Sequence, residues 1–186
     1  MLESNNQKFN HLKIHTQYSI CEGAIKIEDL KEFCKKNKIK SLGLSDTSNL
    51  CGALEFAENI SKVGTQPIIG TQINFKFEDT LGLLPLVALN QEGYKRIIEL
   101  SSKSYLENDQ ISEPHLDIEE LFTKTEGIAL FSGSIKGLFG KLFEKGKLKE
   151  ITNLYSNLIS KFGDRFYLEI QRHGDQNEIV FEKFNL

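Results

Sequence analysis

The amino-acid sequence predicts a single α/β domain in which strands alternate with crossover helices. Apolar segments of strand length recur between residues 9 and 170, and between them apolar residues return at the three- and four-residue spacing of helices. Such alternation is typical of a mostly parallel sheet, either open or closed into a barrel. In both arrangements, functional side chains gather at the carboxyl ends of the strands.

The predicted strands are short and apolar. In the first of them, residues 9–15, Leu12 and Ile14 point to one face, and Lys13 and His15 point to the other. The last predicted strand shows the same alternation of apolar and polar residues. The strands after the first cover residues 42–46, 67–75, 83–89, 127–132 and 166–170.

The predicted helices lie between these strands. Their apolar residues form stripes, as with Ile151, Leu154 and Leu158 in one of them. The segment 107–114 is predicted to be a loop, and a helical pattern begins at residue 177. The four complete helical stripes cover residues 27–34, 53–63, 94–101 and 151–162.

Composition and charge limit the classes of function that the chain can have. Its 186 residues suit one domain with a sizeable core. Acidic residues number 26 and basic residues 23, which gives a net charge of -3. Stand-alone DNA-binding domains are usually basic, because Lys and Arg neutralise backbone phosphates. Any role with DNA is therefore expected to be local, or to belong to something attached to this chain.

Cysteine usage and hydropathy predict a cytoplasmic protein. Cys21, Cys34 and Cys51 have no Cys-x-x-Cys spacing and form an odd set, which disfavours a disulfide framework or a thiolate zinc site. The polar start of the chain lacks an apolar run of signal-peptide length. No stretch approaches the roughly 20 apolar residues of a membrane span. We therefore expect reduced thiols and no membrane partner.

Polar side chains follow the predicted strands at several points. These side chains are His15, Asp46, Gln72, Ser134 and those of residues 171–174. Because strand ends meet at one edge of a parallel α/β fold, we expect these groups to converge around one cleft.

The first strand carries the most informative pair of positions. Residues 13 and 15 share a face and lie roughly 7 Å apart. Two imidazoles there could hold one metal ion, but position 13 is Lys13, and a protonated ammonium cannot bind a metal. His11 would lie about 13 Å from His15 in an extended strand, so His11 is interpreted as a structural histidine.

Two further motifs receive structural interpretations. The lysines of residues 136–149 are interrupted by Glu144, which favours a solvated helix face over a DNA contact. Ser132 and Ser134 flank Gly133 without a His or Asp placed by sequence to activate them, so Gly133 is expected to allow a tight turn.

Six blocks of the sequence resemble, in order and spacing, a known family. The blocks are HLKIHTQYS, GLSDTSNLCGALEF, QPIIGTQ, NQEGYKRIIELSSKSYLE, GIALFSGS and GDRFYLEIQRHG. Across residues 9–176 they are similar to the PHP (polymerase and histidinol phosphatase) domain of the bacterial DNA polymerase III alpha subunit. The resemblance implies a PHP-type distorted (βα) barrel, here lacking its last strands. Residues 1–186 would be an N-terminal, C-terminally incomplete PHP domain, with the polymerase palm and fingers absent.

The resemblance also implies a degenerate metal site. His15, Glu22 and His173 keep the chemistry of ligands. At four other positions, metal-binding relatives have His, His, Glu, and Cys or His. This sequence has Lys13, Thr47, Gln72 and Ser134 there, and none of these is a metal ligand. A last Asp-x-His motif would lie beyond Leu186. Because a zinc site needs three or four converging donors, we expect no catalytic residue and no intact metal site. The vestigial cleft positions are Lys13, His15, Glu22, Asp46, Thr47, Gln72, Ser134 and His173.

A positive charge at position 13 suggests what takes the metal's place. Lys13 is predicted to form a metal-free polar cluster with Asp46 or Glu22, whose charges a metal would otherwise balance. The alternative is that Lys13 extends into solvent.

The function implied by the resemblance is that of a domain in a replicative DNA-directed DNA polymerase, a nucleotidyltransferase of chromosomal DNA replication. This chain alone is expected to be non-catalytic and without a cofactor, with magnesium serving the full polymerase. Its partners would be the rest of the alpha chain and the proofreading exonuclease subunit, with DNA reached only through the full polymerase. The alternative is an active metal-dependent phosphoesterase or 3′-5′ exonuclease PHP domain. A free-standing PHP phosphatase of amino-acid biosynthesis ranks lower.

Overall fold

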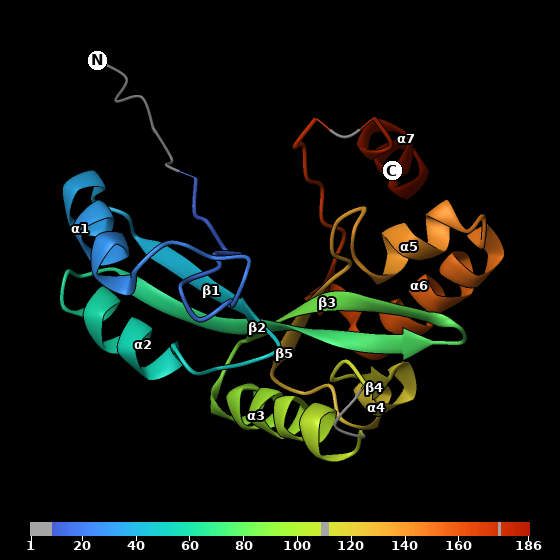
Figure 1. Cartoon of the computed structure of the whole chain (residues 1–186), viewed down its shortest axis with the longest axis horizontal. Helices are drawn as coiled ribbons and strands as arrows, with labels where there is room; N and C mark the ends of the chain where they lie inside the picture. Colours follow the sequence, from blue (N-terminus) through green and yellow to red (C-terminus); the bar gives the residue numbers. More distant parts are fainter. Residues whose placement is uncertain (1–8, 109–111, 175) are drawn as a thin grey trace.

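The computed structural model describes residues 9–108, 112–174 and 176–186. Its helices and strands alternate for much of the chain, as the sequence predicts (Figure 1). In chain order they are α1 (Ile27–Asn37), β1 (Ser41–Thr47), α2 (Ala53–Ser61), β2 (Gln66–Phe77), β3 (Thr80–Ala88), α3 (Gln91–Leu106), β4 (Leu116–Asp117), α4 (Ile118–Thr123), β5 (Ile128–Phe131), α5 (Leu138–Glu144), α6 (Leu148–Phe162), the 3-10 turn η1 (Gly163–Arg165), β6 (Phe166–Tyr167) and α7 (Glu178–Asn185).

The described strands form one open, mixed sheet. Its order is β1-β2-β3-β5-β6, with β4 beside β2. The pairs β1-β2, β2-β4 and β5-β6 are parallel, but β2-β3 and β3-β5 are antiparallel. The prediction of a mostly parallel sheet is therefore only partly right, since β3 runs antiparallel to both of its neighbours. The reason is the connection between β2 and β3, which consists of Glu78 and Asp79; two residues can join only antiparallel strands.

Lysines near α5 hold this hairpin turn. Lys147 lies 2.6 Å from Asp79 and 2.9 Å from Glu78, and Lys145 donates to Thr80 at 2.8 Å. The hydrogen bond from Lys147 lowers the pKa of Asp79 to about 2. Several lysines of residues 136–149 are thus engaged with the protein itself, which agrees with the interpretation that they are not a DNA contact.

The first predicted strand is not a regular strand. Residues 9–15 run beside β1, but only the bridge between Ile14 and Leu44 has strand geometry. Gly43 donates to the His11 carbonyl at 2.7 Å and accepts from the Ile14 amide at 3.1 Å. A side chain at position 43 would come within 2.3 Å of the Leu12 carbonyl oxygen, so glycine permits this close approach.

The helices pack around the sheet in two clusters. One buried cluster joins α1, α2 and β1 through residues such as Phe56 and Leu44. The larger cluster joins β2, β3 and β5 to α3, α5 and α6, with Phe75 and Phe139 fully buried in it. In Figure 1 the smaller cluster lies at the left, and α5, α6 and α7 lie at the right. Two apolar clusters on one sheet leave room between them at one side of it.

Three of the predicted helical stripes lie within observed helices, the stripe 53–63 extends two residues past the end of α2, and the pattern from residue 177 corresponds to α7. The short helices α4 and α5 were not predicted. α4 is 6 residues long, and α5 contains Gly140, which weakens a helical pattern. The predicted loop 107–114 includes residues 109–111, which lie outside the described residues. No helix in the described part of the chain is long and apolar enough to span a membrane.

The two edge strands of the sheet differ in length. β1 is 7 residues long, and β6 is 2 residues long. The prediction of a strand over 166–170 is therefore only partly right, because pairing with β5 covers Phe166 and Tyr167. The open sheet agrees with the expectation of a barrel that lacks strands.

Candidate functional site

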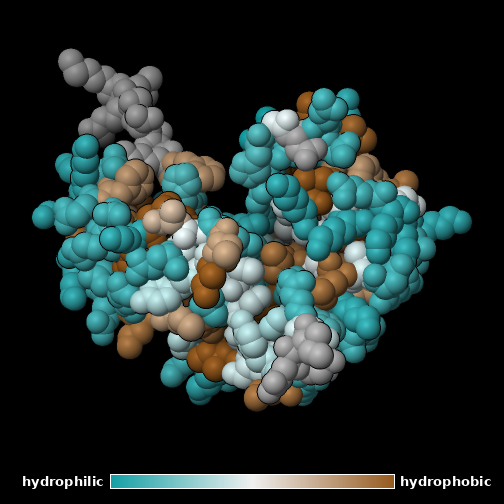
Figure 2. All heavy atoms as spheres, in the orientation of Figure 1, coloured by the Kyte–Doolittle hydropathy of each residue, from teal (hydrophilic) through white to brown (hydrophobic). Residues whose placement is uncertain are grey.

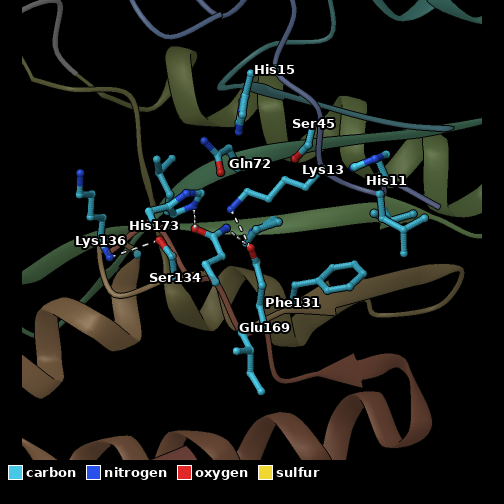
Figure 3. A pocket seen from close by; sticks show the side chains of 18 of the residues that line it. His11, Lys13, His15, Ser45, Gln72, Phe131, Ser134, Lys136, Glu169 and His173 are labelled. Carbon is cyan, nitrogen blue, oxygen red and sulfur yellow. Dashed lines mark hydrogen bonds and ion pairs between the residues drawn. The ribbon is translucent and has the colours of Figure 1, made fainter. Parts of the chain in front are cut away.

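A cavity of about 690 Å³ lies between residues 9–15 and the segment after β6. Figure 2 shows the molecule hollowed between the N-terminal side and α7, and Figure 3 shows side chains from both walls pointing into the cavity. The predicted site residues that line it are Lys13, His15, Glu22, Gln72, Ser134 and His173. The predicted convergence around one cleft is thus confirmed for His15, Gln72, Ser134 and His173. Gln72, however, lies within β2 rather than at its end.

Asp46 lies beneath the cavity rather than in it. It is fully buried at the end of β1, and its carboxylate accepts three hydrogen bonds. The Thr16 amide and hydroxyl donate at 2.6 and 2.7 Å, and the Ser19 hydroxyl donates at 2.6 Å. Both carboxylate oxygens are therefore occupied by protein donors, and Asp46 holds the turn that comes after residues 9–15.

Thr47, Gln72 and Glu22 form a chain of hydrogen bonds. The Gln72 amide donates to the Thr47 hydroxyl at 2.8 Å, and that hydroxyl donates to Glu22. Glu22 lies 3.8 Å from Nδ1 of His15. These side chains satisfy one another, so three positions where the resemblance places ligands are linked without an ion.

Lys13 pairs across the cavity with Glu169, at 3.1 Å. The prediction that Lys13 pairs with Asp46 or Glu22 is wrong, because Asp46 is occupied by Thr16 and Ser19. The alternative that Lys13 extends freely into solvent is also wrong. The exposed fractions of the Lys13 and Glu169 side chains are 23% and 14%, so the pair is partly shielded from water.

Glu169 is the site residue that sequence reasoning missed. It lies just past β6, and its carboxylate also accepts a hydrogen bond from Gln171, which in turn contacts Nε2 of His173 at 3.2 Å. The signal was the alternation of the sequence, because residues 169, 171 and 173 share one face of an extended segment. The alternation continues beyond residue 170, where the predicted strand ends.

Ser134 and His11 play local roles. The Ser134 hydroxyl accepts from the Lys136 amide at 3.3 Å, and the Gly137 amide donates to the Ser134 carbonyl at 2.9 Å, so a turn covers residues 134–137. Gly133 comes directly before this turn, and its φ of 76° is one that glycine adopts readily. The ring of the exposed His11 lies edge-on to that of Phe9, with centroids 4.9 Å apart, and its interpretation as a structural histidine stays a prediction.

The side chains present do not fit a metal ion. An ammonium, two hydroxyls and an amide stand at four positions of the cleft, and none is a good donor for a transition metal. The carboxylate of Asp46 is used by three protein donors. Within residues 9–108, 112–174 and 176–186, no group of three or more His, Cys, Asp or Glu side chains is placed to hold an ion.

The Lys13–Glu169 pair leads to a stability prediction. Replacing Lys13 by Ala should lower the free energy of unfolding by about 1–3 kcal/mol, between the values for exposed and buried pairs. Glu169→Gln should lower the free energy of unfolding by a smaller amount when Lys13 is already absent. The double mutant should therefore show a coupling energy above about 0.5 kcal/mol. Urea denaturation of the four proteins measures this. Lys13→Ala combined with Thr152→Ala on α6 serves as an additive control; additive effects for Lys13 and Glu169 would contradict the pair.

His15 leads to a prediction of pH dependence. Burial of the ring, followed by the charge of Lys13, lowers the pKa of His15 from 6.5. Between the lowered pKa and 6.5 the unfolded chain binds more protons at this residue than the folded chain. Stability should therefore fall as the pH drops from 7 through this window. His15→Gln should flatten that slope in urea titrations at several pH values; an unchanged slope would contradict the assignment.

Comparison with known proteins places the chain in a family. The model of the PHP domain matches residues 11–173. The chain is 35% identical over 187 residues to the DNA polymerase III subunit alpha of Caulobacter vibrioides, covering 94% of this chain and 16% of that protein. The same subunit of Borreliella burgdorferi is 35% identical, covering 95% of the chain and 16% of the protein, and that of Haemophilus influenzae is 33% identical, covering 94% and 15%.

The chain thus spans about one sixth of the length of these curated relatives, at 15–16% of each. The family match extends from the first segment beside β1 to the segment after β6, and so includes both walls of the cavity. Since it covers most of the sequence, the chain belongs to the PHP domain family.

Proposed function

We propose that this chain is the N-terminal PHP domain of a replicative DNA-directed DNA polymerase, acting in the cytoplasm in chromosomal DNA replication. The observation that carries the proposal is the similarity to DNA polymerase III alpha subunits over 94–95% of the chain. The similarity runs through the helices and strands as well as the cleft, so it does not rest on a single motif.

In this proposal residues 1–186 form a PHP domain, and the palm and fingers belong to the rest of the alpha chain. Nucleotide addition requires acidic residues that hold magnesium ions. The magnesium would therefore serve the full polymerase, and DNA would be reached only through it. This chain alone adds no nucleotide.

The cleft is proposed to be a degenerate metal site with a structural role. Lys13, Thr47, Gln72 and Ser134 supply no ligand, while His15, Glu22 and His173 keep ligand chemistry and Asp46 bonds to protein donors. Hydrogen bonds and the Lys13–Glu169 pair join these positions to one another or to neighbouring segments. A cleft stabilised in this way can support the polymerase body and the docking of the proofreading exonuclease subunit without binding an ion.

The metal content of the purified protein tests this proposal. After incubation with zinc or manganese and dialysis without chelator, the protein should carry well under one equivalent by elemental analysis. The combined variant Lys13→His, Thr47→His, Gln72→Glu and Ser134→Cys should gain measurable metal, because it supplies converging donors. The single variants are the matched controls and should not gain it, since one ligand cannot make a site.

The opposite result would favour an active phosphoesterase or 3′-5′ exonuclease. Bound metal near one equivalent, lost in His15→Ala and His173→Ala, would contradict the degenerate site. Metal-dependent hydrolysis of a phosphate ester or of single-stranded DNA, lost in the same variants, would establish that alternative.

The docking role can be measured separately. Titration of this chain with the purified proofreading exonuclease subunit in a calorimeter should give saturable binding. The affinity should be the same with and without EDTA, because no metal takes part. If the exonuclease binds the full alpha chain but not this domain, the docking site lies elsewhere and this part of the proposal is wrong.

A further inference from the structure

The segment 168–174, which we call the strap, forms one wall of the cavity after β6 ends. Pairing of β6 with β5 covers only Phe166 and Tyr167. Beyond them the Glu169 amide donates to the Ser132 side chain at 2.9 Å, and the amides of His173 and Gly174 donate to the side chain of Glu178. The strap is therefore held by side chains rather than by a strand ladder.

Three carboxylates also hold the strap, and they act at different points along it. Glu178, at the start of α7, accepts the two amides at 2.8 and 3.0 Å. Glu182, also on α7, pairs with Arg172 at 2.6 Å. Glu169 alone among the three reaches the opposite wall, where it meets Lys13 (Figure 3). The strap is thus anchored to β6 and α7, and Lys13 holds it across the cavity near its β6 end.

With the Lys13–Glu169 pair formed, two buried polar atoms of the cleft have no hydrogen-bond partner among the described residues. They are the hydroxyl of Ser45 and the Oε2 atom of Glu169. Ser45 is 1% exposed and lines the cavity. Because Ile14 pairs with Leu44, Ser45 lies on the same face as Lys13 and His15. The unsatisfied hydroxyl therefore lies buried on the face of the cavity that carries Lys13.

Unsatisfied buried atoms oppose the closed state. Water reaching the Ser45 hydroxyl and Glu169 would recover hydrogen bonds that the closed state forgoes. The strap also has little apolar packing to oppose its release, since Leu168 and Ile170 are 43% and 46% exposed. Segments with few buried contacts and exposed backbone are those that open locally in folded proteins.

We propose that the strap is a movable wall that opens the cleft, with the Lys13–Glu169 ion pair as its clasp. When the clasp parts, residues 168–171 bow outward between their anchors at β6 and α7. The cavity, already open elsewhere, then extends to the Ser45 hydroxyl, which is buried while the pair is formed. The strap contacts carried by Glu178 and Glu182 remain in place, because both lie on α7, which packs against α5 through Phe181 and Phe143.

Thiol labelling measures this opening. Cys21 and Cys51 are exposed and are replaced by Ser, and Ser45→Cys then places a reporter under the clasp. Cys34, 1% exposed in the other core cluster, reports global unfolding in the same molecule. In the Lys13→Met variant, a disulfide reagent should label the thiol at position 45 about tenfold faster, while the labelling rate of Cys34 changes little. Methionine keeps the apolar stem of Lys13 and removes its charge.

The matched control removes a similar ion pair elsewhere. Lys31→Met deletes the 2.6 Å pair with Glu28 on α1 and should change neither labelling rate. Equal acceleration of both thiols in Lys13→Met would mean global destabilisation and would overturn the proposal. So would an unchanged rate at position 45.

Hydrogen exchange of the strap decides whether the wall itself moves. In Lys13→Met with all native cysteines present, amides of residues 168–171 should exchange faster, while those of α6 keep their rates. Faster thiol labelling with unchanged hydrogen exchange in the strap would mean that the substitution of Lys13 merely uncovers Ser45. The movable wall would then be rejected. This measurement also stands if Ser45→Cys fails to fold.

Discussion

The buried carboxylate of Asp46 sets the geometry on which the rest of the cleft depends. A charge without solvent must be met by donors, and the chain supplies them by turning back immediately after residues 9–15. Thr16 and Ser19 donate to Asp46 in that turn. The turn fixes the end of the first segment, and with it the direction in which Lys13 and His15 enter the cavity. A single burial constraint at the end of β1 thus determines one complete wall.

The second wall is set by a different kind of interaction. The strap after β6 has no strand partner on its outer side among the described residues, so its position depends on charged side chains. Lys13 carries the positive charge that Glu169 requires, and Glu178 and Glu182 connect the strap to α7. The two walls therefore differ in character. The N-terminal wall is held by buried hydrogen bonds. The strap has hydrogen bonds at Ser132 and Glu178, but across the cavity it is held by a partly exposed ion pair, which is weaker and easier to break.

The extent to which the sequence predicted this arrangement depends on the range of each interaction. Convergence of His15, Gln72 and Ser134 was predictable, because alternation and strand ends are local patterns. The antiparallel course of β3 was missed, since apolar strand patterns carry no direction, and only the two-residue connection reveals it. The partner of Lys13 was also missed. Lys13 and Glu169 are 156 residues apart, and no local pattern indicates which of several carboxylates will lie across the cleft.

The way the cleft side chains bond to one another explains why it persists as a cavity. A metal ion draws its ligands to about 2 Å from one centre. Side chains that bond in pairs lie along a line instead, as Gln72, Thr47 and Glu22 do. Such a chain holds its members in place but cannot draw the opposite wall inward. The cavity of about 690 Å³ therefore remains, with apolar walls at Pro85 and Phe131. The Lys13 side chain spans this space to reach Glu169 on the other wall.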